Sequence, residues 1–177
     1  LAPRDVPASL VADVVSRYGH LDILVNNAGI IRREDAIKFS EADWDDVMDL
    51  NLKSVFFLSQ AVAKVFMAQG SGGKIINIAS MLSFQGGIRV PSYTASKSGV
   101  MGITRLMANE WASHGINVNA ICPGPVEGQR MEEVLTNEAR SKGRKAEDLR
   151  KEYTQASSMR EWITPDDVVS LVMLVTS

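Results

Sequence analysis

The sequence predicts an α/β protein in which a parallel β-sheet is doubly wound, with helices on both faces. Two patterns lead to this fold class. Short runs rich in Ile and Val alternate with long segments whose apolar residues recur at helical spacing, as in strands joined by helical crossovers. The short runs also lead into small and polar residues, as at a ligand-binding sheet edge. No repeat or linker-like stretch divides the chain, so we expect one domain over residues 1–177.

The first helix and the first long amphipathic segment have marked ends. A helix over residues 7–18 is expected to stop at Gly19, a residue suited to a helix C-terminus. A long helix over residues 41–69 is expected to begin with a capping box, in which Ser40 accepts a hydrogen bond from the Asp43 amide and the aspartate reaches back. Strands are predicted at residues 23–25, 74–79 and 116–121.

The second half of the chain is predicted to be mostly helical. One helix over residues 93–113 precedes Gly115, and two charged helices at 129–142 and 146–154 are separated by Gly143. A last helix is expected after Thr164, which supplies an N-cap ahead of a proline and two aspartates.

Composition excludes several classes of function. The 177 residues are 45% apolar and 23% charged, with a net charge of −2, which gives no general attraction to nucleic acid. No apolar run is long enough to cross a bilayer, and the single Cys122 cannot form an internal disulfide. His20 and His114 lie apart from paired carboxylates, so we expect no metal site. These features favour a cytoplasmic protein that binds a small molecule.

Tyr93 and Lys97 are the first candidates for catalytic chemistry. Their separation of four residues places both side chains on one face of the predicted helix, one turn apart. A neighbouring ammonium stabilises a phenolate, which brings a phenol towards the range where it exchanges protons at neutral pH. The alternative, a solvated helix face, is the commoner meaning of this spacing when it stands alone.

Ser80 and Asn51 extend this candidate site. Ser80 ends the second predicted strand, where its hydroxyl can donate to a carbonyl oxygen that the tyrosine protonates; the alternative is a serine that only satisfies loop backbone. Asn51 is an amide within an apolar stretch of the long helix. A buried asparagine must be hydrogen-bonded, to a backbone carbonyl or to water, so a structural role is at least as plausible for it as a catalytic one.

These residues stand in the order and spacing of a known family. The segments Asn26–Gly29 and Tyr93–Lys97, with Asn51, Ser80 and the pair Pro123–Gly124, resemble the short-chain dehydrogenase/reductase family between about residues 21 and 124. The resemblance implies a Rossmann-like domain that binds NAD or NADP and interconverts a secondary alcohol and a ketone. It further implies a homodimer or homotetramer assembled through helices 41–69 and 93–113.

The resemblance also assigns roles to individual residues. Tyr93 is implied to be the acid/base, Lys97 to act on Tyr93 and hold the nicotinamide ribose, Ser80 to orient the substrate carbonyl, and Asn51 to hold a water in a proton relay. The residues implied to lie along the cofactor are Asn26, Ala28, Gly29, Tyr93, Lys97, Pro123, Gly124 and Val126.

The run from Ser80 to Tyr93 resembles the branch of the family that acts on sugar acids. Within it, Gln85 or Arg89 could meet a substrate carboxylate, since a guanidinium pairs with a carboxylate in two-pronged geometry. The alternative for Arg89 is a surface loop residue. Residues 125–160 are expected to form a substrate lid, although Gly128 stands where many relatives have a threonine.

The sequence has no counterpart of the family's glycine-rich turn after its first strand. We therefore expect a domain that lacks the N-terminal strands and the last strand of the family, with an unpaired edge at residues 23–25. Two alternatives to an active dehydrogenase follow. The chain could be a non-catalytic module that responds to a dinucleotide, or a fragment that is inactive on its own.

Overall fold

The computed structural model describes residues 6–177, which form two compact units. The boundary falls between Cys122 and Pro123. The first unit contains a β-sheet and the helices of the N-terminal two thirds of the chain, and the second is helical. The sequence predicts one domain because no linker-like composition marks this boundary, whereas the structure has two compact units on either side of it.

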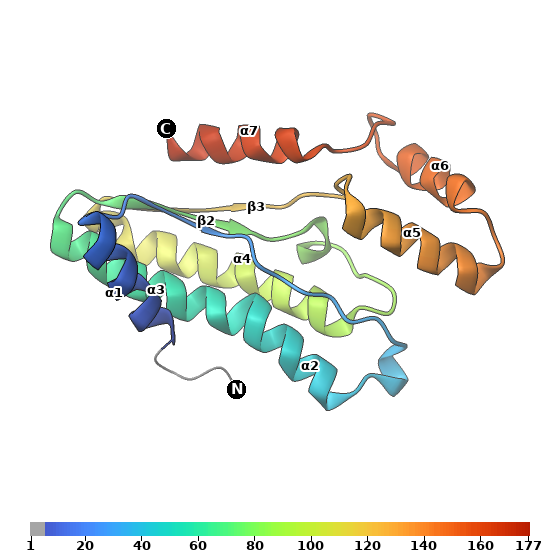
Figure 1. The fold of residues 1–177 in the computed structure, drawn as a ribbon, viewed down its shortest axis with the longest axis horizontal. Coiled ribbons are helices and arrows are strands. Elements are labelled where there is room, and N and C mark those ends of the chain that lie inside the picture. The colour runs from blue at the N-terminus through green and yellow to red at the C-terminus, as the bar shows by residue number, and fades with distance from the viewer. Residues whose placement is uncertain (1–5) are drawn as a thin grey trace. The chain divides into compact units, whose positions relative to one another are not determined.

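The sheet of the first unit has three parallel strands in the order β1 (Ile23–Asn26), β2 (Gly73–Ile78) and β3 (Ile116–Ile121) (Figure 1). All three predicted strands are confirmed to within one residue. Among the described residues β1 pairs only with β2, and its side chains Ile23 and Val25 are 43% and 41% exposed. The expected open edge at this strand is therefore present.

Three helices cover one face of this sheet: α1 (Val6–Tyr18), α3 (Ser54–Gln69) and α4 (Pro91–Trp111) (Figure 1). Their apolar faces meet the sheet around Phe66 and Ile75, both of which are fully buried. The other buried members of this core are Val11, Val62, Ala63, Met107, Ile116 and Val118. Burial of these side chains, at roughly 1.5–3 kcal/mol each, is the main force that holds the unit together.

The segment predicted as one helix over residues 41–69 is interrupted. Helix α2 (Glu41–Met48) passes into a π-helical turn, η2 (Asp49–Lys53), before α3 begins. In this turn the Ser54 amide donates to the carbonyl of Asp49, five residues earlier instead of four. The expectation of a continuous α-helix is wrong here because a π-turn adds one residue without breaking the apolar face, so helical spacing does not reveal it.

Of the capping box predicted for α2, the serine half is present, and the Asp43 carboxylate bonds to the Ser40 hydroxyl in place of the Ser40 backbone amide. The Ser40 hydroxyl accepts from the Asp43 amide at 3.1 Å and donates to the Asp43 carboxylate at 2.9 Å. Helix α4 begins at Pro91, two residues before the predicted start, because proline at the first turn of a helix lacks only an amide that would have no helical partner. Short 3₁₀ turns that the sequence did not indicate lie at Ala36–Lys38, Met81–Ser83 and Ala112–His114.

A buried polar network links the sheet to α3 and α4. Asn26 at the end of β1 donates to Asn77 of β2 at 2.8 Å and to Ser59 of α3 at 3.0 Å. Asn77 in turn donates to Thr104 of α4 at 2.9 Å. All four side chains are at most 8% exposed. Because unpaired polar groups are costly in the interior, this network favours one relative placement of two strands and two helices.

The second unit contains α5 (Gln129–Lys142), α6 (Ala146–Ala156) and α7 (Pro165–Thr176). Gly143 ends α5 at a φ of 62°, as the sequence predicts, and Leu135, Ala139 and Leu149 form a small core between α5 and α6. Segment 125–160 therefore has apolar packing of its own. The predicted cap of α7 is a full capping box between Thr164 and Asp167.

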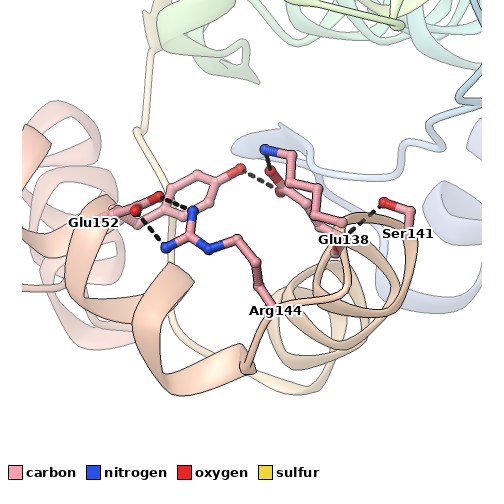
Figure 2. A network of polar contacts seen from close by, with 6 residues as sticks. Glu138, Ser141, Arg144 and Glu152 are labelled. Carbon is pink, nitrogen blue, oxygen red and sulfur yellow. Dashed lines mark hydrogen bonds and ion pairs between the residues drawn. The ribbon is translucent and has the colours of Figure 1, made fainter.

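Ion pairs fasten the turn between α5 and α6 (Figure 2). The Arg144 guanidinium donates to both carboxylate oxygens of Glu152, at 3.1 and 2.6 Å, and it holds the pKa of that carboxyl below its usual value. Glu138 accepts from Lys142 at 2.6 Å and from the Tyr153 hydroxyl at 3.1 Å. The ion pairs of Arg144 with Glu152 and of Lys142 with Glu138 are exposed, so they add orientation to the hairpin more than stability.

Within residues 6–177 no helix is long and apolar enough to cross a membrane. The same residues include no group of three or more His, Cys, Asp or Glu side chains placed to hold a metal ion.

Candidate active site

Tyr93 and Lys97 lie one turn apart at the N-terminal end of α4. The Lys97 ammonium is 5.7 Å from the centroid of the Tyr93 ring, and the lysine is only 5% exposed. Its nitrogen donates to the carbonyl oxygen of Ile78, the last residue of β2, at 2.6 Å. A buried cation is therefore held between the end of the central strand and the phenol.

Ser80 follows β2 by two residues and begins the 3₁₀ turn η3 (Met81–Ser83). Its oxygen accepts from the Leu82 amide at 3.2 Å, which leaves its own hydrogen to be donated elsewhere. The turn is fixed to α4 because the Ser83 hydroxyl donates to the carbonyl of Lys97 at 2.8 Å. The structure thus brings Ser80, Tyr93 and Lys97 to the carboxyl end of β2, while their chemical roles stay predictions.

Asn51 occupies the middle of the π-turn and is fully buried. Its carboxamide forms both possible bonds with the backbone of Ile30, accepting from the amide at 2.9 Å and donating to the carbonyl at 2.8 Å. The backbone acceptor left open by the sequence reasoning is therefore present. A Cβ at Gly29 would lie 3.3 Å from the Asn51 Oδ1 and 3.7 Å from the Lys97 nitrogen, so glycine permits a close approach here.

Ser96 is a site residue that the sequence reasoning missed. It is fully buried, and its hydroxyl donates to the Tyr93 carbonyl at 2.8 Å and accepts from the Asn51 carboxamide at 3.4 Å. A small polar residue three positions after the tyrosine was the available signal. That spacing lets a helical serine bond back to the preceding turn.

The residues expected along the cofactor occupy different environments. The buried Asn26 side chain donates its hydrogen bonds to Asn77 of β2 and Ser59 of α3. Ala28 is exposed and Gly29 half-buried, directly after β1. Pro123 and Gly124 begin the second unit, where Val126 bridges to Ile163.

Arg89 fastens two loops that flank the site. Its guanidinium pairs with Glu34 at 3.4 Å and with Asp35 at 3.0 Å, and its carbonyl accepts from the Glu34 amide at 3.1 Å. Its backbone has a φ of 62°, a left-handed conformation that is uncommon outside glycine. Gln85 is exposed on the same loop. The structure therefore gives Arg89 two carboxylate partners from the protein itself.

Cys122 closes the end of β3 near this region. Burial raises the pKa of its thiol, against smaller opposing effects of the Ser80 backbone and Lys97. The thiol donates to the sulfur of Met101 at 3.5 Å. A neutral thiol in this setting is a packing group.

The fold and these placements define a class of protein. It is a Rossmann-like α/β domain with a buried lysine, a phenol and two serines gathered where the parallel strands end, the position at which open α/β sheets bind ligands.

Comparisons with known proteins refine this assignment. A family model described as short chain dehydrogenase matches residues 2–139, and the chain belongs to that family. The 2-dehydro-3-deoxy-D-gluconate 5-dehydrogenase of Escherichia coli (strain K12) is 59% identical over 172 residues, which are 97% of this chain and 64% of that protein. The enzyme of the same name from Dickeya dadantii (strain 3937) is 70% identical over 76% of this chain and 53% of its own length.

Solved structures of dehydrogenases are also similar to this chain. A structure from Agrobacterium tumefaciens named for 2-deoxy-D-gluconate 3-dehydrogenase, with bound NADP, is 48% identical with a TM-score of 0.83, and the alignment covers 100% of this chain and 68% of that one. An NAD⁺-bound xylitol dehydrogenase, 24% identical, reaches 0.92 over 99% of this chain and 69% of its own and shows the fold alone. The predicted doubly wound class is confirmed by these likenesses. The chain spans between about half and two thirds of the curated relatives described above.

Proposed function

We propose that the chain forms the catalytic part of an NAD(P)-dependent oxidoreductase that interconverts a secondary alcohol and a ketone on a sugar acid. The observation that carries this proposal is the Lys97 ammonium, buried between the Tyr93 ring and the end of β2, with Ser80 on the adjoining turn. The names of the relatives support a deoxygluconate or its keto form as the substrate.

The chain's own residues would move one proton. During oxidation Tyr93 acts as the phenolate and takes the hydroxyl proton of the alcohol, and during reduction the neutral phenol returns it. Ser80 donates a hydrogen bond to the same substrate oxygen. The Lys97 ammonium lies 5.7 Å from the centroid of the Tyr93 ring, next to the group that would exchange this proton.

The residues present fit a nicotinamide cofactor. Small residues at Ala28 and Gly29 follow β1, where a larger side chain at Gly29 would crowd the Asn51 carboxamide. Ala28 and Gly29 would hold the cofactor together with Tyr93 and Lys97, which lie in the same unit. When bound, NAD or NADP supplies hydride exchange with the carbinol carbon. Bound NADP in the Agrobacterium structure supports this choice.

Assembly as a homodimer or homotetramer is proposed through residues 41–69 and 93–113. Large apolar side chains on these helices remain exposed in the single chain, among them Phe57 and Leu106 at 45% each. Such side chains are commonly covered by a second subunit. The alternative of a non-catalytic dinucleotide-responsive module is weaker, because a pure binder has no need of Ser80, Tyr93 and Lys97 together.

The test is NAD(P)-dependent oxidation of deoxygluconate by two proteins. The first protein is this chain alone. The second, called the chimera, is the E. coli relative with its matching segment replaced by this chain. We expect turnover by the chimera and little turnover by the chain alone, since binding a dinucleotide needs both halves of the sheet. An inactive chimera that is folded and binds NADPH would contradict the proposed chemistry, and turnover by the chain alone would contradict its dependence on the remainder.

Arg89 provides a test of substrate recognition. We expect Arg89→Ala in the chimera to raise KM several-fold for acidic and neutral alcohols alike, because the guanidinium already pairs with Glu34 and Asp35 and serves to hold the loops. Steady-state kinetics on both substrate types measure this effect. A rise in KM confined to acidic substrates would instead assign Arg89 to the substrate carboxylate. In that case the double variant Glu34→Gln/Asp35→Asn should lower KM for acidic substrates, because it frees the arginine from its partners in the protein.

A further inference from the structure

We propose that Ser96 is a positioning residue for Tyr93, an inference that rests on the function proposed above. Its hydroxyl donates to the Tyr93 carbonyl at 2.8 Å and accepts from Asn51 at 3.4 Å, and the side chain is fully buried. Ser96 thereby connects the π-turn of the long helix to the residue that exchanges the proton.

The backbone of Ile30 determines which groups donate and which accept in the hydrogen bonds between Asn51, Ser96 and Tyr93. Because the Asn51 Oδ1 accepts from the Ile30 amide and the Asn51 Nδ2 donates to the Ile30 carbonyl, the carboxamide cannot be turned over. Its nitrogen must therefore face Ser96 as a donor, and the Ser96 hydroxyl must accept from it. The hydrogen of that hydroxyl is then directed to the Tyr93 carbonyl. One chain of bonds runs from the loop after β1 to the backbone of Tyr93.

The Tyr93 carbonyl, which accepts this bond, belongs to the helical turn that joins Tyr93 to Lys97. In an α-helix the carbonyl of residue i accepts from the amide of residue i+4, so the Tyr93 carbonyl also faces the Lys97 amide. The Ser96 hydroxyl thus acts on the helical turn that joins the phenol to the ammonium. This turn lies at the start of α4, where the first amides lack helical partners and the helix is held less firmly. A buried tether at this point fixes how far the phenol projects towards Ser80.

Ser92 supplies a matched control. It lies in the same helix, next to Tyr93, and is fully buried like Ser96, but its hydroxyl has no hydrogen-bond partner within residues 6–177. Replacing Ser92 with alanine removes an oxygen of the same kind and burial without breaking a bond to the site. Removal of an unpaired buried hydroxyl is close to neutral.

The experiment compares Ser96→Ala, Ser92→Ala and Ser96→Thr in the chimera. We expect Ser96→Ala to lower kcat on the order of tenfold to a hundredfold, because a small displacement of a catalytic group has effects of this size, with KM for NADP and substrate nearly unchanged. Ser92→Ala is expected to keep the parent kcat. Threonine in a helix can make the same bond to a preceding carbonyl, so Ser96→Thr should retain most of kcat even where its added methyl lowers the melting temperature.

The outcomes separate a positioning role from a structural one. If kcat follows melting temperature across the three variants, or if Ser96→Ala and Ser92→Ala have equal kcat, the proposal is wrong. A second measurement does not depend on enzyme activity. In the 177-residue chain, Ser96→Ala should shift and speed the exchange of the Asn51 side-chain NH₂ signals in NMR spectra, and Ser92→Ala should not. An inactive chimera with this NMR result would refute the proposed function but retain the contact, whereas an active chimera with unchanged kcat in Ser96→Ala would refute the inference alone.

Discussion

Replacing Tyr93 with phenylalanine in the chimera is expected to lower kcat by about 10²–10⁴, the range that general acid–base groups contribute. The change removes one hydroxyl and leaves the ring, so the Lys97 ammonium keeps an aromatic neighbour at the same place. Binding of NADPH, measured by calorimetry, should therefore change little. The rate loss should exceed that of Ser96→Ala, because one variant removes the proton carrier and the other only displaces it.

Tyr18→Phe is the matched control for this variant. Tyr18 ends α1 and is 77% exposed, so the same loss of a hydroxyl occurs far from any proposed chemistry. We expect its kcat and melting temperature to equal those of the parent. Turnover by Tyr93→Phe within a few-fold of Tyr18→Phe would refute the acid/base assignment, and a loss of NADPH affinity equal to the loss of rate would reassign Tyr93 to cofactor binding.

The strands and most helix ends of this protein follow from local sequence. The strand Ile116–Ile121 is a short segment rich in Ile and Val between Gly115 and Cys122, and both of its ends agree with the prediction. Ser40 and Thr164 mark helix starts because a hydroxyl can satisfy an amide that the helix leaves unpaired, and both make that bond. Tyr93 and Lys97 were placed on one helix face because that depends only on residue spacing.

Features that depend on partners distant in sequence were not predictable in this way. Asn51 stood out as an amide among apolar residues, but its pairing with Ile30 requires the π-turn to aim it, and apolar spacing does not report such a turn. Arg89 was considered for a substrate carboxylate because a free guanidinium suits one. Arg89 instead pairs with Glu34, 55 residues earlier in the sequence, and with Asp35. The residue spacing within either loop gives no sign of this long-range pairing.

The Asn26 and Asn77 network is the clearest case, and it leads to the largest expected effect on stability. Asn77 reads as one polar residue inside an apolar strand, with no local sign of its partners. In the structure it is fully buried, accepts from Asn26 at 2.8 Å and donates to Thr104 at 2.9 Å. Alanine at this position would break both bonds and leave a buried donor of Asn26 with one partner fewer.

We expect Asn77→Ala to destabilise the first unit by about 2–4 kcal/mol, the sum of two lost hydrogen bonds and the cost of polar groups left unpaired in the interior. Hydrogen exchange of the β2 amides measures this directly, because it reports opening of the sheet and not of the helical second unit. Asn119→Ala on β3 is the control, since Asn119 is an exposed strand asparagine whose removal should cost well under 1 kcal/mol. Equal protection in the two variants would mean that the network adds no net stability. A selective loss would mean that the buried network holds β1 against β2 and α3, so that Asn26, which the family resemblance implies to lie along the cofactor, has a structural role at the end of β1.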